Sequence, residues 1–113
     1  MKKVNRIVKG NYHNDFEDYL ELSDGTTIHF HHEQDCCENV YADLSALEDT
    51  GFETDGNLTL NNLHISLVKG YGVKINSYGI PCYNEQNGYY DSSITVIVKH
   101  NFDVDTYGHS DID

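Results

Sequence analysis

The stretch HFHHEQDCCENVYAD, residues 29–43, gathers side chains that can bind a metal, exchange electrons or attack a substrate. It contains three histidines, the adjacent cysteines Cys36 and Cys37, and four carboxylates. Such a set raises three kinds of chemistry: a metal site, a redox pair and a nucleophilic centre. The spacing of the residues helps to decide among them.

A zinc site is the first interpretation of this stretch. Zinc takes four Cys or His ligands in a tetrahedron, usually supplied as two spaced pairs. Adjacent cysteines in extended backbone point to opposite faces, so Cys36 and Cys37 do not readily share one ion. A site would combine one of them with a histidine such as His32 and with the distant Cys82. These four residues are the metal candidates, but their spacing is no zinc signature, and we expect no cofactor.

Redox and nucleophilic chemistry find less support. A disulfide between adjacent cysteines closes a strained ring, and nothing resembles a C-x-x-C motif. A reactive thiolate needs electropositive neighbours, whereas Glu33, Asp35 and Glu38 flank the two cysteines. No glycine-rich loop or oxyanion-hole motif accompanies the histidines. We therefore expect no catalytic residue here, and favour a structural turn in which one cysteine is buried as a small hydrophobe.

The distribution of charge is the strongest global feature of the sequence. The net charge is −12, and residues 10–68 contain thirteen Asp and Glu but no Lys or Arg. Such a charge repels nucleic acid and attracts basic protein surfaces, including the grooves in which other proteins hold DNA or RNA. It argues against direct binding of nucleic acid. The alternative interpretation is that the acidity only keeps the protein soluble.

Length and composition indicate one domain without a membrane segment. We place the domain at residues 1–102 of the 113, followed by an acidic tail, residues 103–113, whose composition allows disorder. No apolar run approaches the ~20 residues that a transmembrane helix needs. The basic N-terminus lacks an apolar signal-peptide core, and three cysteines argue against a secreted disulfide framework. We expect a cytoplasmic protein; a homodimer is left open.

The clearest structural element is a hairpin whose strands, residues 16–22 and 26–32, flank the turn signal SDGT. A two-residue loop would pair Leu22 with Thr27. A three-residue loop with a left-handed Gly25 pairs Leu22 with Thr26 instead, and Leu20 with Ile28. We prefer the second register because it collects the apolar side chains on one face. That face holds Phe16, Leu20, Leu22, Ile28, Phe30 and His32, and the other face holds His29 and His31.

The remaining elements complete a strand-rich chain. An opening strand is expected around residues 4–9, and a helix of about two turns over residues 43–50, with Asp43 as N-cap and Gly51 as terminator. Asn87 and Gly88 predict a tight turn. Further strands are expected at NLTL (57–60), LHISLV (63–68), GVKINSY (72–78) and SSITVIV (92–98). The predicted fold class is α+β, β-rich, with a single mainly antiparallel sheet of about 5–7 strands and one short helix near residues 43–50.

Two motifs in this order resemble a family of small bacteriophage and prophage proteins of unknown function. The first is H-x-Q-D-C-C-E after an Asp-Gly hairpin, and the second is an N-G-Y-Y hairpin before the last strand. The resemblance covers most of residues 4–98 and implies a phage or mobile-element origin and a non-enzymatic protein. Tyr41-Ala42, a shortened middle and the acidic tail depart from the family pattern. The matching residues are His32, Gln34, Asp35, Cys36, Cys37 and Glu38, then Asn87, Gly88, Tyr89 and Tyr90.

The acidic block predicts an interaction protein. Its carboxylates would occupy the basic groove of a host protein that binds nucleic acid or serves in defence, as DNA-mimic and anti-CRISPR inhibitors do. Such binding weakens as salt is added. The residues expected to form the acidic surface are Asp15, Glu17, Asp18, Glu21, Asp24, Asp43, Glu48, Asp49, Glu53 and Asp55.

The alternative function is a small metal- or thiol-stabilised structural or accessory phage protein. In that case His32, Cys36, Cys37 and Cys82 would organise the turn around a transition metal. Metal content on purification discriminates the two functions, as does melting with a chelator, because structural zinc contributes folding energy directly.

Overall fold

The strands of this chain fall into two sheets in a computed structural model that describes residues 4–8, 18–31, 40–84, 88–90 and 94–108. Within those ranges the chain forms nine strands and three 3-10 helices. The strands are β1 (Arg6–Val8), β2 (Tyr19–Glu21), β3 (Thr27–His31), β4 (Val40–Ala42), β5 (Ile65–Val68), β6 (Gly72–Ile75), β7 (Tyr78–Asn84), β8 (Thr95–His100) and β9 (Asp103–Tyr107). The helices are η2 (Leu44–Leu47), η3 (Phe52–Thr54) and η4 (Leu60–Asn62).

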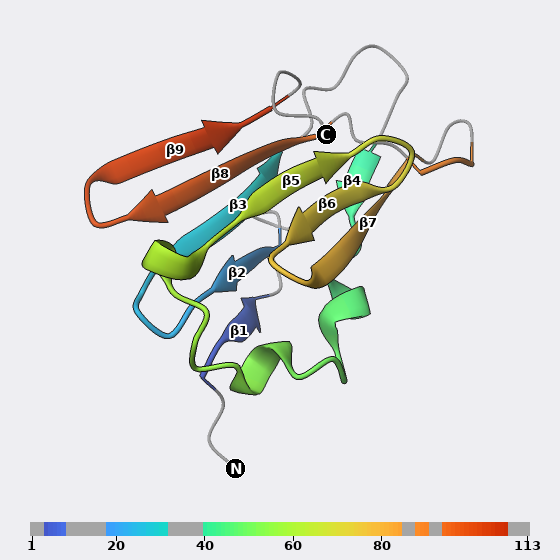
Figure 1. The fold of residues 1–113 in the computed structure, drawn as a ribbon. Helices are drawn as coiled ribbons and strands as arrows, with labels where there is room; N and C mark the ends of the chain where they lie inside the picture. The colour runs from blue at the N-terminus through green and yellow to red at the C-terminus, as the bar shows by residue number, and fades with distance from the viewer. Residues whose placement is uncertain (1–3, 9–17, 32–39, 85–87, 91–93, 109–113) are drawn as a thin grey trace.

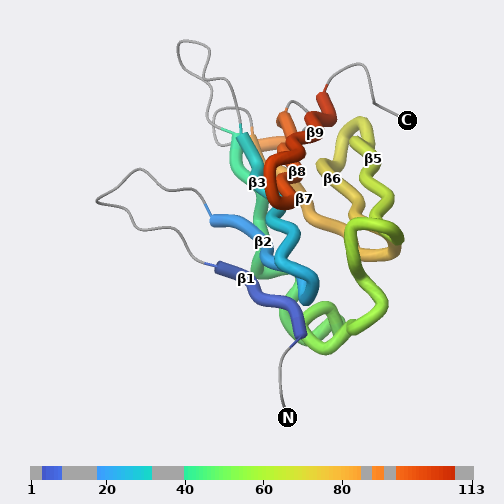
Figure 2. The backbone as a smooth tube through the Cα atoms, turned by 90° about the vertical axis from the view of Figure 1, so that its left-hand side faces the viewer, coloured from blue at the N-terminus to red at the C-terminus, as the bar shows by residue number. Residues whose placement is uncertain are grey.

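Both sheets are antiparallel. The five-stranded sheet has the order β1-β2-β3-β8-β9, and the four-stranded sheet has the order β4-β7-β6-β5. Figure 1 shows the strands from the front, and Figure 2, turned by 90°, shows β2 and β3 in one layer and β5 and β6 in the other. The strand-rich antiparallel fold is confirmed. The prediction of a single sheet is wrong, because there are two.

Alternating burial along the strands explains the two layers. In β3, Ile28 and Phe30 are buried while His31 is exposed, and in β7, Ile80 and Cys82 are buried between half-buried neighbours. Each sheet therefore has one apolar face that must be covered. The 3-10 helices are too short to cover a sheet, so the two apolar faces cover each other. The side chains buried from both sheets belong to one hydrophobic core.

The β2–β3 hairpin has the predicted register. Leu20 pairs with Ile28, Leu22 N–H donates to Thr26 O at 2.8 Å, and Gly25 is left-handed with φ 89°. Leu20, Leu22, Ile28 and Phe30 are all buried, as the one-sided pattern requires. His29 and His31 lie on the outer face, where His29 stacks on Tyr19 with ring centroids 4.9 Å apart. Phe16 and His32 lie outside the described residues.

The predicted two-turn helix at residues 43–50 is replaced by shorter helices. Leu44–Leu47 forms a single 3-10 turn, since Glu48 is already extended (ψ 139°) and Asp49 is left-handed (φ 63°). A second 3-10 helix, η3, follows directly, and a third, η4, includes Leu60 from the NLTL segment that was predicted as a strand. No helix among the described residues is long and apolar enough to cross a membrane.

The start of the expected acidic tail is ordered. Asp103–Tyr107 forms β9, which pairs with β8 along its whole length, from His100 opposite Asp103 to Val96 opposite Tyr107. The first five residues of the expected tail thus form a strand, and the expected boundary at residue 102 falls within the β8–β9 hairpin. Exposed carboxylates on this edge strand discourage edge-to-edge pairing with another chain. Residues 109–113 lie outside the described ranges.

Candidate functional site

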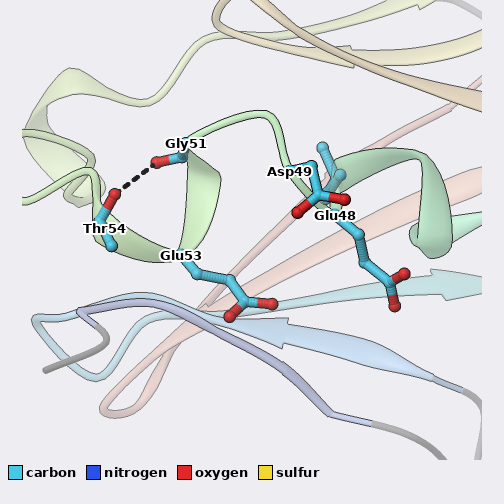
Figure 3. Close-up of a pocket in the computed structure, with 6 residues that line it drawn as sticks. Glu48, Asp49, Gly51, Glu53 and Thr54 are labelled. Carbon is cyan, nitrogen blue, oxygen red and sulfur yellow. Dashed lines mark hydrogen bonds between the residues drawn. The ribbon is translucent and has the colours of Figure 1, made fainter. Parts of the chain in front are cut away.

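Three of the predicted acidic residues lie together where η2 is joined to η3: Glu48 and Asp49 on the joining turn, and Glu53 in η3 (Figure 3). We call residues 48–53, the joining turn and the start of η3, the acidic turn. Glu48 and Asp49 are exposed, and Glu53 is half-buried. Their side chains border an open pocket of about 480 Å³, which is lined by Leu47, Glu48, Asp49, Gly51, Glu53 and Thr54.

Local sequence holds the acidic turn in place. Leu47, immediately before the acidic turn, and Phe52, near its end, are buried at 1% and 0% exposure and anchor it in the core. Between them, Asp49 and Gly51 take left-handed backbone that reverses the chain. Thr50 closes the reversal, because its Oγ1 donates to Leu47 O (2.6 Å) and accepts from Phe52 N–H (3.3 Å). The carboxylates are therefore displayed from a fixed backbone.

Two carboxylates of the acidic turn, those of Glu48 and Asp49, have no hydrogen-bond or ion-pair partner among the residues that the structure describes. No Lys or Arg occurs between residues 10 and 68 to approach them along the chain. Carboxylates that border an open pocket attract the ammonium and guanidinium groups of a partner protein. Binding of basic side chains is the chemistry that this arrangement supports.

Asp24, another predicted surface carboxylate, has a structural role. Its Oδ1 accepts from Thr26 N–H (3.1 Å) in the β2–β3 turn, and its Oδ2 accepts from Leu60 N–H (3.0 Å), which joins the hairpin to η4. Burial acts to raise the pKa of Asp24, but hydrogen bonds from Leu60 and Thr26, with His100 nearby, outweigh it and hold the pKa below its ordinary value. The ionised form is therefore part of the fold.

Asp55 is also used internally. Its Oδ1 accepts from Asn57 N–H at 3.0 Å, and its Oδ2 accepts from the Tyr78 hydroxyl at 2.5 Å. The Tyr78 ring packs edge-on against Phe52, with centroids 5.4 Å apart. Burial, together with the hydrogen bond to Asp55 and its negative charge, raises the pKa of Tyr78 to about 12. Asp55 therefore attaches the segment after η3 to β7.

We expect this contact to lower stability in alkaline solution. An unfolded tyrosine ionises near pH ~10, whereas folded Tyr78 stays protonated to about 12. Unfolding therefore releases a proton as the pH rises from about 10 towards 12, and the free energy of unfolding falls over that range. Tyr78→Phe should cost about 1 kcal/mol at neutral pH and remove that part of the alkaline decline. Urea denaturation at a series of pH values checks this; an unchanged decline in the variant would contradict it.

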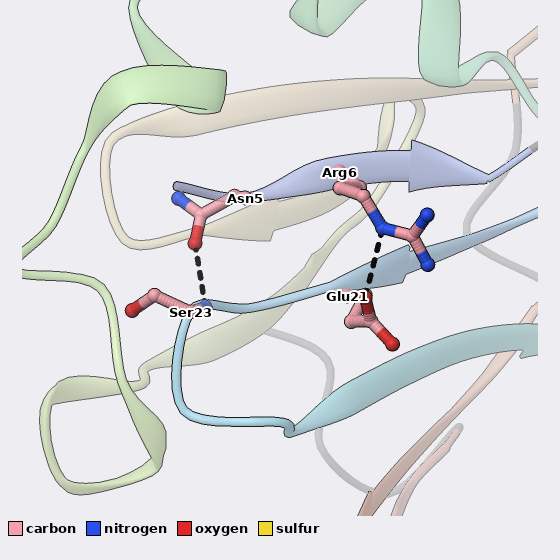
Figure 4. Close-up of polar contacts among 4 residues, drawn as sticks. All are labelled: Asn5, Arg6, Glu21 and Ser23. Carbon is pink, nitrogen blue, oxygen red and sulfur yellow. Dashed lines mark hydrogen bonds and ion pairs between the residues drawn. The ribbon is translucent and has the colours of Figure 1, made fainter. Parts of the chain in front are cut away.

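Glu21 and Asp43 make internal contacts as well. Glu21 Oε1 accepts from Arg6 Nε at 2.8 Å across the β1–β2 pair (Figure 4). The two side chains are 36% and 61% exposed, so the ion pair contributes about 0–1 kcal/mol. Asp43 Oδ1 accepts from Ser45 N–H (3.2 Å) and caps η2, as the sequence predicts. Neither carboxylate is wholly free to serve a partner.

Of the three remaining predicted acidic residues, the structure describes only Asp18. Asp18 is half-buried and lies immediately before β2 of the five-stranded sheet. Asp15 and Glu17 lie outside the described residues. The predicted surface of ten carboxylates is thus divided: four have structural contacts, three gather at the acidic turn, and the rest are elsewhere or not described.

Of the four candidate metal ligands, only Cys82 lies among the described residues. His32, Cys36 and Cys37 lie outside the described residues. Cys82 is 0% exposed, on the face of β7 that points into the core, and its thiol contacts the Ile80 carbonyl at 3.8 Å. In the part of the chain with described placement, no group of three His, Cys, Asp or Glu residues could hold a metal ion.

Sequence reasoning missed a group of tyrosines on the opposite, outward face of β7. Tyr83 contacts Tyr41 of β4 and Tyr90, with ring centroids 6.0 and 5.8 Å apart. Alternation in IPCYN indicates that Tyr83 and Cys82 face opposite ways, but the sequence does not show that Tyr41 and Tyr90 lie on either side of it.

Comparison with known proteins adds no relative: no family model, curated protein or solved structure matches this chain. The resemblance to phage proteins remains a prediction from the two motifs.

Proposed function

We propose that this chain is a non-enzymatic phage- or prophage-type protein that binds a basic surface of a host protein and blocks its use of nucleic acid. The observation that supports this most is the acidic turn, where Glu48 and Asp49 are exposed on a backbone fixed by Thr50. Their carboxylates can replace phosphates in a basic groove and release the same counterions. The partner would be met in the host cytoplasm.

The acidic residues fall into two groups, those whose carboxylates hold the fold together and those whose carboxylates could bind a partner. Asp24, Asp43 and Asp55 accept hydrogen bonds that hold turns and helices together. Neutralising them would change the fold as well as the charge. Glu48 and Asp49 make no such contact with described residues, so their charge is available to a partner. The polar side chains of the residues that line the pocket are three carboxylates and the Thr54 hydroxyl, a set suited to binding cations rather than to activating a nucleophile.

The test is capture of host proteins at low salt by the wild-type chain and two charge-matched variants. Glu48→Gln/Asp49→Asn removes two charges at the acidic turn, and Asp103→Asn/Asp105→Asn removes two from exposed positions of β9. We expect the wild type and the β9 variant to capture the same nucleic-acid-binding protein, which duplex DNA and added salt then release. The acidic-turn variant should bind that protein about fivefold more weakly.

Two outcomes would contradict the proposal. One is that no nucleic-acid-binding protein is captured at low salt. The other is that both variants lose binding equally, which would mean that only net charge matters. Thermal denaturation of both variants should match the wild type, since the carboxylates of neither pair contact another described residue.

A further inference from the structure

The outward face of the four-stranded sheet carries a connected group of tyrosines. Tyr83 in β7 lies between two of them. It pairs with Tyr41 of β4 on one side, and an isolated β-bridge joins it to Tyr90 on the other. Both ring contacts are edge-on, with interplanar angles of 68° and 66°. The three rings therefore form a row across the sheet edge where β4 and β7 lie side by side (Figure 1).

Tyr71 extends this row. It precedes β6, and its carbonyl accepts from Cys82 N–H at 2.9 Å, which places it beside β7. Its ring end lies over Gly79, where a Cβ would overlap the Tyr71 hydroxyl, so the glycine makes room for the ring. Burial and the nearby Cys82 thiol and Tyr90 hydroxyl raise the pKa of Tyr71. We call Tyr41, Tyr71, Tyr83 and Tyr90 the tyrosine face.

The tyrosine face is accessible, and the exposed Lys74 of β6, which pairs with Gly79, lies at its Tyr71 end. Tyr41 is 44% exposed, Tyr71 37% and Tyr90 52%. Along the described part of β7, the outward positions between these rings are taken by Gly79 and Pro81. A group of accessible tyrosines is typical of a protein interface core, where aromatic side chains are enriched relative to the rest of the surface.

The net negative charge of the protein favours one kind of binding partner for the tyrosine face over the others. A second copy of the chain would bring another net charge of −12 against the first, and the phosphates of a nucleic acid would be repelled in the same way. An arginine side chain fits better, because its planar guanidinium stacks on aromatic rings and its charge is opposite to that of the protein. The start of η2 lies beside β7, since Asp43 N–H donates to Pro81 O at 2.9 Å.

We propose that the tyrosine face is the docking surface for arginine side chains of the basic partner. This rests on the proposed function and deepens it, because it separates the two kinds of contact: the acidic turn binds positive charge of either kind, while the tyrosine face selects arginine over lysine. The partner should therefore present an arginine-rich segment or groove.

Oligo-arginine and oligo-lysine peptides of equal length are the probes. Affinity at low salt should be higher for oligo-arginine, and Tyr41→Leu/Tyr90→Leu should weaken its binding about tenfold while leaving oligo-lysine nearly unchanged. Tyr41→Phe/Tyr90→Phe keeps the ring faces and should keep the preference. Phe102→Leu is the matched control, because Phe102 is a fully exposed aromatic in the β8–β9 turn.

The outcomes separate this inference from the function on which it rests. Equal affinity for both peptides, unaffected by the tyrosine variants but reduced by Glu48→Gln/Asp49→Asn, would overturn the tyrosine face and leave the acidic turn intact. Binding of neither peptide would contradict both. Dimerisation of the wild type that is lost in Tyr41→Leu/Tyr90→Leu would show that the face binds a second copy, and would also overturn the inference.

Discussion

Asn5→Ala is expected to lower the free energy of unfolding by about 3 kcal/mol. Asn5 is 0% exposed, and its amide joins three segments of the chain. Nδ2 donates to Phe52 O (2.7 Å) and to Asp55 O (3.0 Å), and Oδ1 accepts from Ser23 N–H (3.0 Å), as Figure 4 shows for the last of these. Alanine would leave these backbone groups without their partner in or near the core. Chemical denaturation measures the loss.

Two further variants make the Asn5 prediction specific. Asn5→Asp keeps the size and the acceptor but places a carboxylate against two carbonyl oxygens, which raises its folded pKa above the ordinary value of about 3.9. Its cost should be full at neutral pH and shrink as the pH falls through the raised pKa, because the protonated form can donate. Asn61→Ala, at an exposed position of η4, should change stability by less than about 0.5 kcal/mol. Equal stabilities for Asn5→Ala and Asn61→Ala would contradict the assigned role.

Gly72→Ala is the second substitution with a large expected effect, about 3 kcal/mol or more. Gly72 has φ 150°, which residues with a side chain rarely adopt. A Cβ there would lie 2.5 Å from both Cys82 N and Ile80 O. These atoms are the backbone of β7, which cannot move away without disturbing the β6–β7 pairing. Thermal and urea denaturation should both report the loss.

Gly56→Ala is the matched control. Gly56 is exposed, and a Cβ there meets no atom within 4 Å. Its substitution should be neutral or stabilise by up to about 1 kcal/mol, because alanine restricts the unfolded chain. If Gly72→Ala were as stable as Gly56→Ala, the close approach of β6 to β7 would be disproved.

The features that could be predicted from the sequence are those that a short segment determines by itself, such as a hairpin register or a helix cap. The Leu20–Ile28 register follows from a turn with Gly25 and from apolar residues that must share one face. Asp43 was recognisable as a cap because its partner, Ser45, is two residues away. In both cases the deciding contacts lie close together in the sequence.

The two-sheet arrangement depends on contacts that no local pattern specifies. Phe30 in β3 pairs with Val96 in β8, far along the chain, and this pairing completes one sheet and leaves β4 to join another. The roles of Asp24 and Asp55 are hidden in the same way, since the groups they bind, Leu60 N–H and the Tyr78 hydroxyl, are 36 and 23 residues distant. A sequence shows that these residues are acidic, but only the fold shows which of them it uses.

The central claim is that the acidic turn binds a basic partner. Amide NMR during a titration with oligo-lysine at low salt tests this claim most directly. The largest chemical-shift changes should fall on residues 48–53, with much smaller ones on β9, although Asp103 and Asp105 are also exposed. The changes should disappear as salt screens the charges. Changes spread evenly over all acidic residues, or concentrated on β9, would contradict the claim and leave the acidity without a specific binding site.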